Sequence, residues 1–272
     1  MELTGLADCH QINGIAANQR LQMEPAMQAI TTQALAIALT VCTLLNAGLA
    51  QDDKTPAPKE INLTVPGEWL SRTIGNEKAR WQNQKTPAKV TIEPGHTYAL
   101  VIRDATDKHL ASLSALKDVA LWTLELPSSE VTDQGVANLK QLKVHSLIIS
   151  SSNLTDNGVA SLAEMEGVNF LYLSSCSRVT DKGLAHLKKM AGLEQLWITA
   201  NSRITNDGLK AIAEMGALRD LSLYGSKLIT DEGALHLAKS KSLRFVFFGD
   251  TSVTEAGIKE LKKKLPDCDA NR

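Results

Sequence analysis

The sequence predicts an α/β solenoid, a stack of similar coils that each contain one short strand and one helix. Three features of the sequence support this fold class. A threonine recurs in steps of 23 to 25 residues, an aliphatic residue recurs eight or nine residues before it, and a glycine lies three residues after it. Repeats of about 20–29 residues with regular leucines build such stacks. The recurring threonines are Thr132, Thr155, Thr180, Thr205, Thr230 and Thr254.

Each copy begins with a predicted strand that carries two inward-facing apolar positions. Alternate side chains of a strand point to opposite faces, so we expect these positions to face the interior and the residues between them to face outward. The first position holds Leu124, Leu147, Leu171, Leu196, Leu221 and Val246. The second holds Leu126, Ile149, Leu173, Ile198, Leu223 and Phe248. Side by side, the strands would form one parallel sheet that is buried on one face.

A small or polar residue follows each strand. We expect its side chain to bond backbone groups of the turn that would otherwise be unpaired inside the coil. The position holds Ser129, Ser152, Cys176, Asn201, Ser226 and Thr251. Buried thiols are usually inert, so a cysteine at this position is expected to be a small core residue and not a nucleophile.

The string Thr-Asp-x-Gly is expected to start each helix. The Thr or Asp side chain would cap free backbone N–H groups, and the acid would favour the positive end of the helix dipole. The glycine would allow close backbone approach, because glycine inside a helix otherwise costs stability. The acids also form a column that could suggest calcium, but capping is favoured and no metal site is expected. That column is Asp133, Asp156, Asp181, Asp231 and Glu255.

The first copy of the repeat is degenerate. In "VIRDATDKHLASLSALKDV", Thr106 is in phase with the later threonines, but His109 stands where glycine belongs. Terminal repeats are often atypical because they cap the stack. At the other end, the last helix is expected to end before Pro266.

The best copy, "VNFLYLSSCSRVTDKGLAHLKKM" at residues 168–190, resembles the cysteine-containing class of leucine-rich repeats. This class is known from the substrate-recognition arms of F-box proteins and from many bacterial repeat proteins. The resemblance covers residues 98–265, although the cysteine occurs in one copy only and no F-box-like segment precedes the repeats. It implies a horseshoe of about six to seven repeats, with a concave parallel sheet, convex helices and a protein-binding role.

The amino-terminal part is expected to direct export. Residues 34–50, "ALAIALTVCTLLNAGLA", resemble a secretory signal with cleavage after Ala50. An uncleaved anchor or a buried helix are the alternatives, and the run is shorter than the ~20 apolar residues of a membrane span. We therefore predict a secreted, periplasmic or cell-envelope protein without a membrane span in the mature chain.

The predicted domains follow from these segments. Residues 1–50 are an export leader, 51–60 a proline-containing linker, and 61–97 a small β region that caps the stack or forms a separate unit. The repeat domain occupies residues 98–265, and residues 266–272 form a carboxy-terminal tail.

Composition and motifs argue against nucleic-acid binding and catalysis. The formal net charge is -1, whereas a nucleic-acid binder needs a basic surface. The 4 cysteines show no CxxC pair, and no glycine-rich phosphate loop, HExxH or GxSxG string occurs. We therefore expect no catalytic residue, no metal and no cofactor, and predict that the chain is not an enzyme.

The outward positions of the predicted strands collect aromatic residues. Aromatic side chains flanked by polar ones supply much of the energy of protein interfaces, and they also stack on sugars. The predicted binding residues are Phe170, Tyr172, Trp197, Tyr224, Phe245 and Phe247. A neighbouring segment that covers this face, or self-association through it, would explain the same pattern.

The leading functional hypothesis is an exported, non-enzymatic recognition protein that binds a protein or glycan on its concave sheet. One alternative is an enzyme or enzyme subunit whose chemistry lies in residues 61–100. Another is a self-assembling component of the cell envelope.

Overall fold

The computed structural model describes residues 58–63, 65–73, 82–85 and 89–272. The predicted leader and residues 51–57 of the predicted linker lie outside the described residues. Within the described part, the strands form a ten-stranded sheet and a separate two-stranded sheet. None of the helices described there is long and apolar enough to cross a bilayer.

The large sheet is built mainly from parallel strands that follow one another in sequence order, as a stack of coils requires. These strands are β5 His96–Val101, β6 Ala120–Leu126, β7 Lys143–Ser150, β8 Phe170–Ser174, β9 Gln195–Thr199, β10 Asp220–Tyr224, β11 Phe245–Phe247 and β12 Asp269–Asn271. From β6 to β11, neighbours pair without offset, so that Leu171 lies beside Leu196 and Tyr172 beside Trp197. Equivalent repeat positions therefore form straight columns across the sheet.

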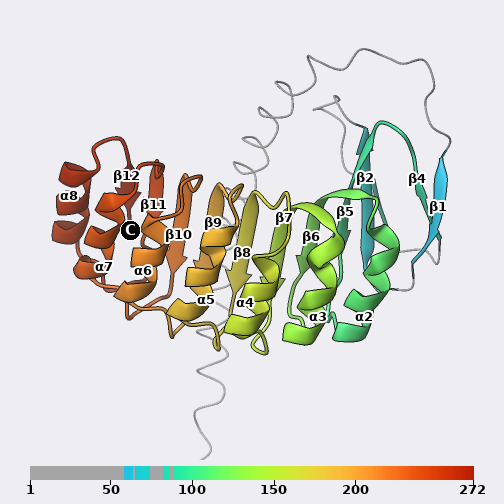
Figure 1. Ribbon diagram of the computed structural model, residues 1–272, viewed down its shortest axis with the longest axis horizontal. Helices are drawn as coiled ribbons and strands as arrows, with labels where there is room; N and C mark the ends of the chain where they lie inside the picture. The colour runs from blue at the N-terminus through green and yellow to red at the C-terminus, as the bar shows by residue number, and fades with distance from the viewer. Residues whose placement is uncertain (1–57, 64, 74–81, 86–88) are drawn as a thin grey trace, which may run out of the picture. The chain divides into compact units, whose positions relative to one another are not determined.

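One short helix connects each strand to the next, and the helices lie in a layer on one side of the sheet (Figure 1). They are α2 Asp107–Ser112, α3 Asp133–Ala137, α4 Asp156–Leu162, α5 Asp181–His186, α6 Asn206–Ala213, α7 Asp231–His236 and α8 Glu255–Lys264. Several continue as 3-10 turns: η2 Leu113–Leu116, η3 Asn138–Gln141, η4 Leu187–Lys189 and η5 Leu237–Lys239.

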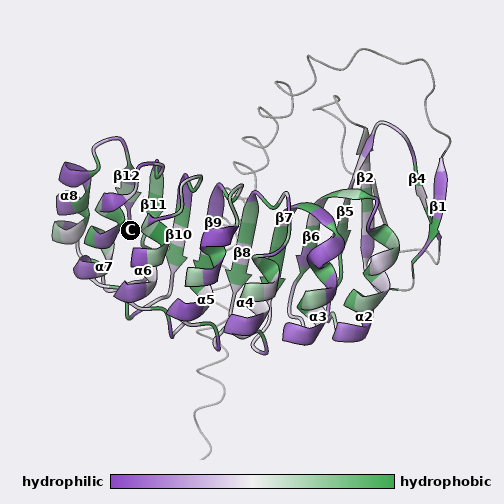
Figure 2. Ribbon diagram, viewed as in Figure 1, coloured by the Kyte–Doolittle hydropathy of each residue, from purple (hydrophilic) through white to green (hydrophobic). Residues whose placement is uncertain are grey.

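The core lies between the sheet and the helices. All twelve predicted inward strand residues, from Leu124 to Phe248, have an exposed fraction of 0%. Figure 2 shows the same division, with apolar residues along the strands and polar residues on the outer sides of the helices. A fully buried leucine contributes roughly 1.5–3 kcal/mol, so this shared interior is the main source of stability. The predicted solenoid fold is confirmed.

The acidic column connects successive coils. Thr205 donates its backbone N–H to Asp181 Oδ1 at 2.9 Å and its hydroxyl to Asp181 Oδ2 at 2.7 Å. The same two contacts recur along the stack, except that Asn206 accepts the Thr230 N–H and donates its amide to the Thr230 hydroxyl. The junction pairs are Asp107–Thr132, Asp133–Thr155, Asp156–Thr180, Asp181–Thr205, Asn206–Thr230 and Asp231–Thr254.

The prediction that the acid caps its own helix was therefore wrong. The threonine is the cap: Thr205 Oγ1, for example, accepts a hydrogen bond from Asp207 N at 3.3 Å. The acid instead reaches one coil forward, where glycine makes room for it. A Cβ on Gly208 would lie 2.5 Å from Asp181 Oδ1, closer than side-chain atoms pack. The glycine accommodates the neighbouring carboxylate.

The first copy carries His109 where the other copies carry glycine, and its contacts give the reason. Within the described ranges, no earlier residue supplies a carboxylate to Thr106, and its N–H is bonded to Nδ1 of His109 at 3.2 Å. A side chain can replace glycine at position 109 because no acid needs the space. His109 thus completes the first helix from within that helix.

One prediction at the turn after the strand was also wrong. Ser152 is exposed, and the buried residue of this copy is Ser151, whose hydroxyl donates to the Val131 carbonyl at 2.7 Å. The turns after β6, β8, β9 and β11 include a non-glycine residue with positive φ, such as Ser175 at 54°. The turn after β7 omits that residue, so the buried position moves back by one.

The two ends of the repeat array extend the sheet. At the amino-terminal end, β2 Glu68–Thr73 pairs antiparallel with β5 and with β3 Gln82–Lys85. The small sheet joins β1 Lys59–Asn62, which begins inside the predicted linker, to β4 Lys89–Ile92. At the other end, the predicted tail contains β12, which pairs with β11.

Candidate ligand-binding surface

The side of the sheet opposite the helices presents three columns of outward side chains, which we call the open face. It corresponds to the predicted concave face. The first column is Thr123, Ser146, Phe170, Gln195, Asp220 and Phe245. The second is Glu125, Ile148, Tyr172, Trp197, Ser222 and Phe247. The third is Pro127, Ser150, Ser174, Thr199, Tyr224 and Gly249.

All six predicted binding residues lie on the open face, and three of them form a group around Trp197. The Phe170 ring centroid lies 4.9 Å from that of Trp197, with an interplanar angle of 88°. The Tyr172 ring lies 6.0 Å away at 72°. Edge-to-face contacts of this kind are favourable and restrict ring movement. The three rings therefore form a preorganised group across β8 and β9.

Two of the remaining aromatic side chains meet over Gly249. A Cβ on Gly249 would lie 2.6 Å from Tyr224 Cδ2 and even closer to the Phe247 ring. The absence of a side chain at residue 249 is therefore what allows both rings to lie where they do. Phe245, two residues before Phe247 on β11, is the most open of the six, with 37% of its surface exposed.

Polar side chains connect neighbouring strands between the rings. The Tyr172 hydroxyl is 3.1 Å from Thr199 Oγ1, which donates to Ser174 Oγ at 3.1 Å. Gln195 Nε2 donates to Asp220 Oδ2 at 2.7 Å. These bonds cross from β8 to β9 and from β9 to β10, so they hold the polar and aromatic side chains in fixed relative positions.

The charged residues of the three columns are both acids. Burial raises the pKa of Glu125, an effect that nearby Arg103 partly opposes. Burial likewise raises the pKa of Asp220, while the bond from Gln195 and the charge of Arg219 lower it. The columns contain no Lys, Arg or His. The open face is therefore aromatic and mildly acidic.

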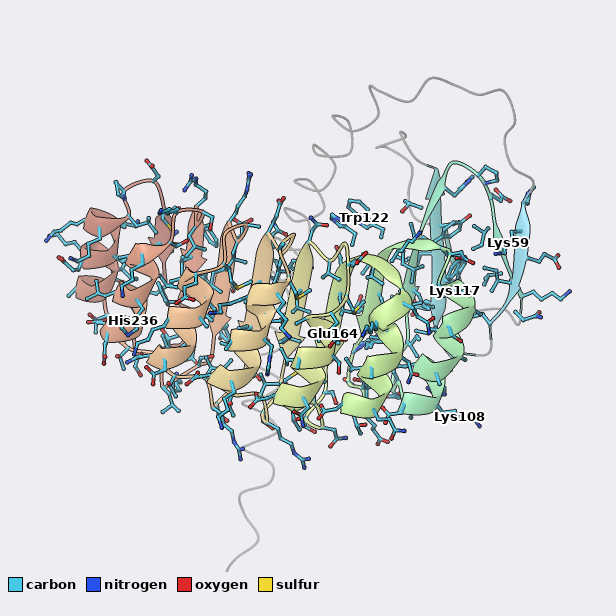
Figure 3. All side chains as sticks on the ribbon, viewed as in Figure 1. Lys59, Lys108, Lys117, Trp122, Glu164 and His236 are labelled. Carbon is cyan, nitrogen blue, oxygen red and sulfur yellow. The ribbon has the colours of Figure 1, made fainter. Side chains whose placement is uncertain are left out.

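Sequence reasoning missed several features of the surface. Gln195 and Asp220 were not predicted as a pair, although they occupy the same column position in adjacent repeats. It also missed Trp122, whose ring stacks on that of His145 with centroids 4.1 Å apart. Figure 3 shows Trp122 at an edge of the sheet, away from Glu164 and His236 on the helical side. Trp122 and His145 directly precede the first column in adjacent copies. Aligning the repeats would therefore have placed the two rings side by side.

The two cysteines in the described part of the chain, Cys176 and Cys268, are buried. Cys176 is fully buried, its Sγ lies 3.3 Å from the Ser174 carbonyl, and burial raises its pKa to about 11. Burial raises the pKa of Cys268 to about 11 as well. Within the described ranges, no three or more His, Cys, Asp or Glu side chains are grouped so that they could hold a metal ion.

The repeating coil defines the class of protein: one parallel strand, one turn with a buried polar residue, and one helix per coil is the architecture of a leucine-rich-repeat solenoid. The family model described as "Leucine Rich repeat" matches residues 141–163, which span β7 and α4. The matched segment is one repeat of the stack. The cysteine-containing subclass stays a prediction.

Solved structures of bacterial leucine-rich-repeat proteins are similar to this chain. Internalin C2 from Listeria monocytogenes is 21% identical, with a TM-score of 0.46 over 63% of this chain and 69% of that one. A leucine-rich-repeat protein from Leptospira interrogans is 20% identical, with a TM-score of 0.44 over 60% of this chain and 39% of that one. The comparison with curated proteins found no match.

Proposed function

We propose that this chain is a non-enzymatic recognition protein that binds a protein or glycan ligand on its open face. The observation that carries the proposal is the gathering of Phe170, Tyr172, Trp197, Tyr224, Phe245 and Phe247 on one side of one sheet. Large apolar patches on soluble proteins commonly mark contact surfaces. Aromatic anchors with polar neighbours are the usual energetic centres of protein interfaces.

The fixed geometry of the rings supports this role. Binding costs free energy when side chains become ordered at the interface. Trp197 is already held by two edge contacts, and the Tyr172 hydroxyl is bonded to Thr199. Little additional order would be imposed on these residues by a ligand, which favours tight binding for a given contact area.

The spacing of the acids favours binding over catalysis. Glu125 lies on β6 and Asp220 on β10, four strands away. At about 4.8 Å per strand, their backbones are about 19 Å apart, too far to act together as a general acid and base on one bond. The open face thus offers contacts and charge without a reactive pair.

We also propose export of the protein, on the strength of residues 34–50. The predicted leader lies outside the described residues, so this proposal depends on the sequence. Mass spectrometry of the mature amino terminus tests it directly. A terminus at Gln51 is expected, whereas an intact amino terminus on the mature protein contradicts export through a cleaved signal.

The binding proposal is tested by affinity capture with the full chain and a Tyr172→Ala/Trp197→Ala variant. Loss of two central aromatics typically costs more than about 2 kcal/mol, so recovery of the specific partner should fall at least about tenfold. The matched control is Trp122→Ala, which removes a tryptophan outside the three columns. Far-ultraviolet circular dichroism must show that both variants are folded. Equal capture by wild type and the double variant contradicts the proposal.

A further inference from the structure

The part of the open face around Ser222 combines aromatic rings with a carboxylate. Ser222 pairs in register with Trp197 on β9 and with Phe247 on β11. On its own strand, its same-face neighbours are Asp220 and Tyr224. Ser222 is the short side chain among these five residues. A ligand group placed over it would therefore be within reach of three aromatic residues and one acid.

The distances across the sheet suit a planar group. Trp197 and Phe247 are two strands apart, which separates their backbones by about 10 Å. A planar group in van der Waals contact with a ring on each side needs about 7–8 Å between the rings. Ser222 has a short side chain in this column, where the neighbouring strands carry Tyr172, Trp197 and Phe247.

The charge at this position is negative and incompletely balanced. Asp220 is half-buried, and its hydrogen bond comes from the neutral amide of Gln195. Two other charges are close enough to influence it: Arg219, which is exposed, and Glu194, which opposes the effect of Arg219. Burial raises the pKa of Asp220, because removal from water disfavours the charged form. A cation from a ligand would compensate it.

We propose that the Ser222 position receives an arginine side chain of a protein ligand. Guanidinium is planar, stacks on aromatic rings and binds carboxylates, and these are the three features that the surrounding residues provide. Trp197, Phe247 and Tyr224 would contact its faces and edges through cation–π interactions, and Asp220 Oδ1 would accept its hydrogen bonds. The inference rests on the proposed binding function and names the chemistry that the open face recognises.

The test uses a pentapeptide, Gly-Gly-Arg-Gly-Gly amide, titrated into the full chain. Nuclear magnetic resonance follows the Trp197 indole N–H and the Ser222 backbone N–H. Saturable shifts of both signals are expected. The peptide with citrulline, which keeps the shape of arginine without its charge, should bind at least about tenfold more weakly. The lysine peptide should bind at least about threefold more weakly, because it lacks the planar group.

Variants locate the interaction. Asp220→Asn retains the side-chain shape and an acceptor for Gln195, and should weaken arginine-peptide binding at least about fivefold. Ser222→Leu fills the position and should abolish the shifts while Asp220 is intact. The matched control is Glu125→Gln, which removes the other acid of the open face; it should change affinity less than about twofold. Thermal unfolding of each variant verifies that it is folded.

Several binding results would overturn the proposed arginine site at Ser222. Equal binding of the arginine and citrulline peptides, equal losses in Asp220→Asn and Glu125→Gln, or shifts confined to other residues would each overturn the inference. Lysine binding as tight as arginine binding would overturn the arginine assignment. A captured partner that needs Tyr172 and Trp197 but tolerates Asp220→Asn would leave the proposed function standing and overturn this inference. If capture of the partner is unaffected by Tyr172→Ala, Trp197→Ala and Asp220→Asn, and no peptide binds, both the proposed function and this inference are overturned.

Discussion

At the junction of α5 and α6, Thr205 donates its N–H to the carboxylate of Asp181 from the previous coil, whereas in α2 the N–H of Thr106 bonds to His109 of the same helix. The interior junction therefore needs a glycine, Gly208, to make room for the incoming acid. The first helix of the array carries a histidine at the glycine position, and none of the residues described before it directs an acid into it. Gly208 is therefore dictated by Asp181, which lies 27 positions earlier in sequence. Its own helix would prefer almost any other residue.

The largest expected effect tests whether Gly208 is required by the carboxylate of Asp181. Gly208→Ala should improve helix propensity by about 1 kcal/mol, but the new Cβ would lie 2.5 Å from Asp181 Oδ1. Overpacking of this kind costs about 1–3 kcal/mol and here also disturbs the bonds to Thr205, so we expect a net loss of about 2 kcal/mol. Urea unfolding of the full chain measures it.

Two controls sharpen this result. Gly216→Ala adds a Cβ that meets no atom within 4 Å, and its free energy of unfolding should stay close to that of wild type. In an Asp181→Ala background, the cost of Gly208→Ala should largely disappear, because the carboxylate that it meets is gone. An unchanged cost in that background would show that another contact requires the glycine.

A smaller loss is expected from Asp181→Asn, which reproduces the junction between Asn206 and Thr230. At that junction Asn206 donates to Thr230 Oγ1 at 2.9 Å, and the Thr230 side chain caps no helix N–H. Transferring this geometry to Thr205 should remove its cap and two charge-assisted bonds, at a cost of about 1–2 kcal/mol. Chemical denaturation gives the value. Asp207→Asn, an exposed change two residues beyond Thr205, should cost less than about 0.5 kcal/mol.

The first helix should tolerate substitution better than the interior junctions. His109→Ala removes one hydrogen bond to the Thr106 N–H but creates no clash, so we expect a loss of about 0.5–1 kcal/mol. Hydrogen exchange at the Thr106 amide should accelerate more than exchange in α5. If His109→Ala costs as much as Gly208→Ala, the two regions do not differ in the way the contacts indicate.

The smallest expected effect is a gain. Asn206→Asp should free the Thr230 hydroxyl to cap its helix, but Glu232, now 3.3 Å from the Asn206 amide nitrogen, would repel the new charge. The single variant should therefore be nearly neutral, and Asn206→Asp combined with Glu232→Gln should gain about 0.5 kcal/mol. Differential scanning calorimetry of the single and double variants checks this order. A double variant that melts below wild type contradicts the expectation that the Asn206 amide keeps the Thr230 hydroxyl from capping its helix.

Much of the fold was predictable because its determinants are periodic and local. The inward columns, from Leu124 to Phe248, followed from alternation in a strand and from the same spacing of apolar residues in each copy. The placement of Phe170, Tyr172 and Trp197 on one face followed from the same periodicity. The error at Ser152 arose because the turn after β7 loses its left-handed residue, and residue spacing alone does not say which turn residue is missing.

The role of the acidic column was not predicted because its contacts connect residues far apart in sequence. Asp181 looks like the cap of its own helix when α5 is considered alone, and the bond to Thr205 exists only once coils are stacked. A signal was nevertheless present. His109 replaces glycine in the first copy, whereas a glycine follows in every copy whose preceding copy carries Asp or Asn at the acid position. Comparing each acid with the following copy would have revealed the pair.

The forward reach of each acid has a consequence for how such a chain can lengthen. A duplicated segment of 25 residues inserted between Asp107 and Gly257 supplies both halves of a junction. Its acid bonds to the following coil, and its glycine makes room for the acid of the preceding coil. The same segment placed before Thr106 would direct an acid against His109. New coils can therefore be accepted in the middle of the array, while its first helix acts as a stop that would need a second substitution before growth from that end.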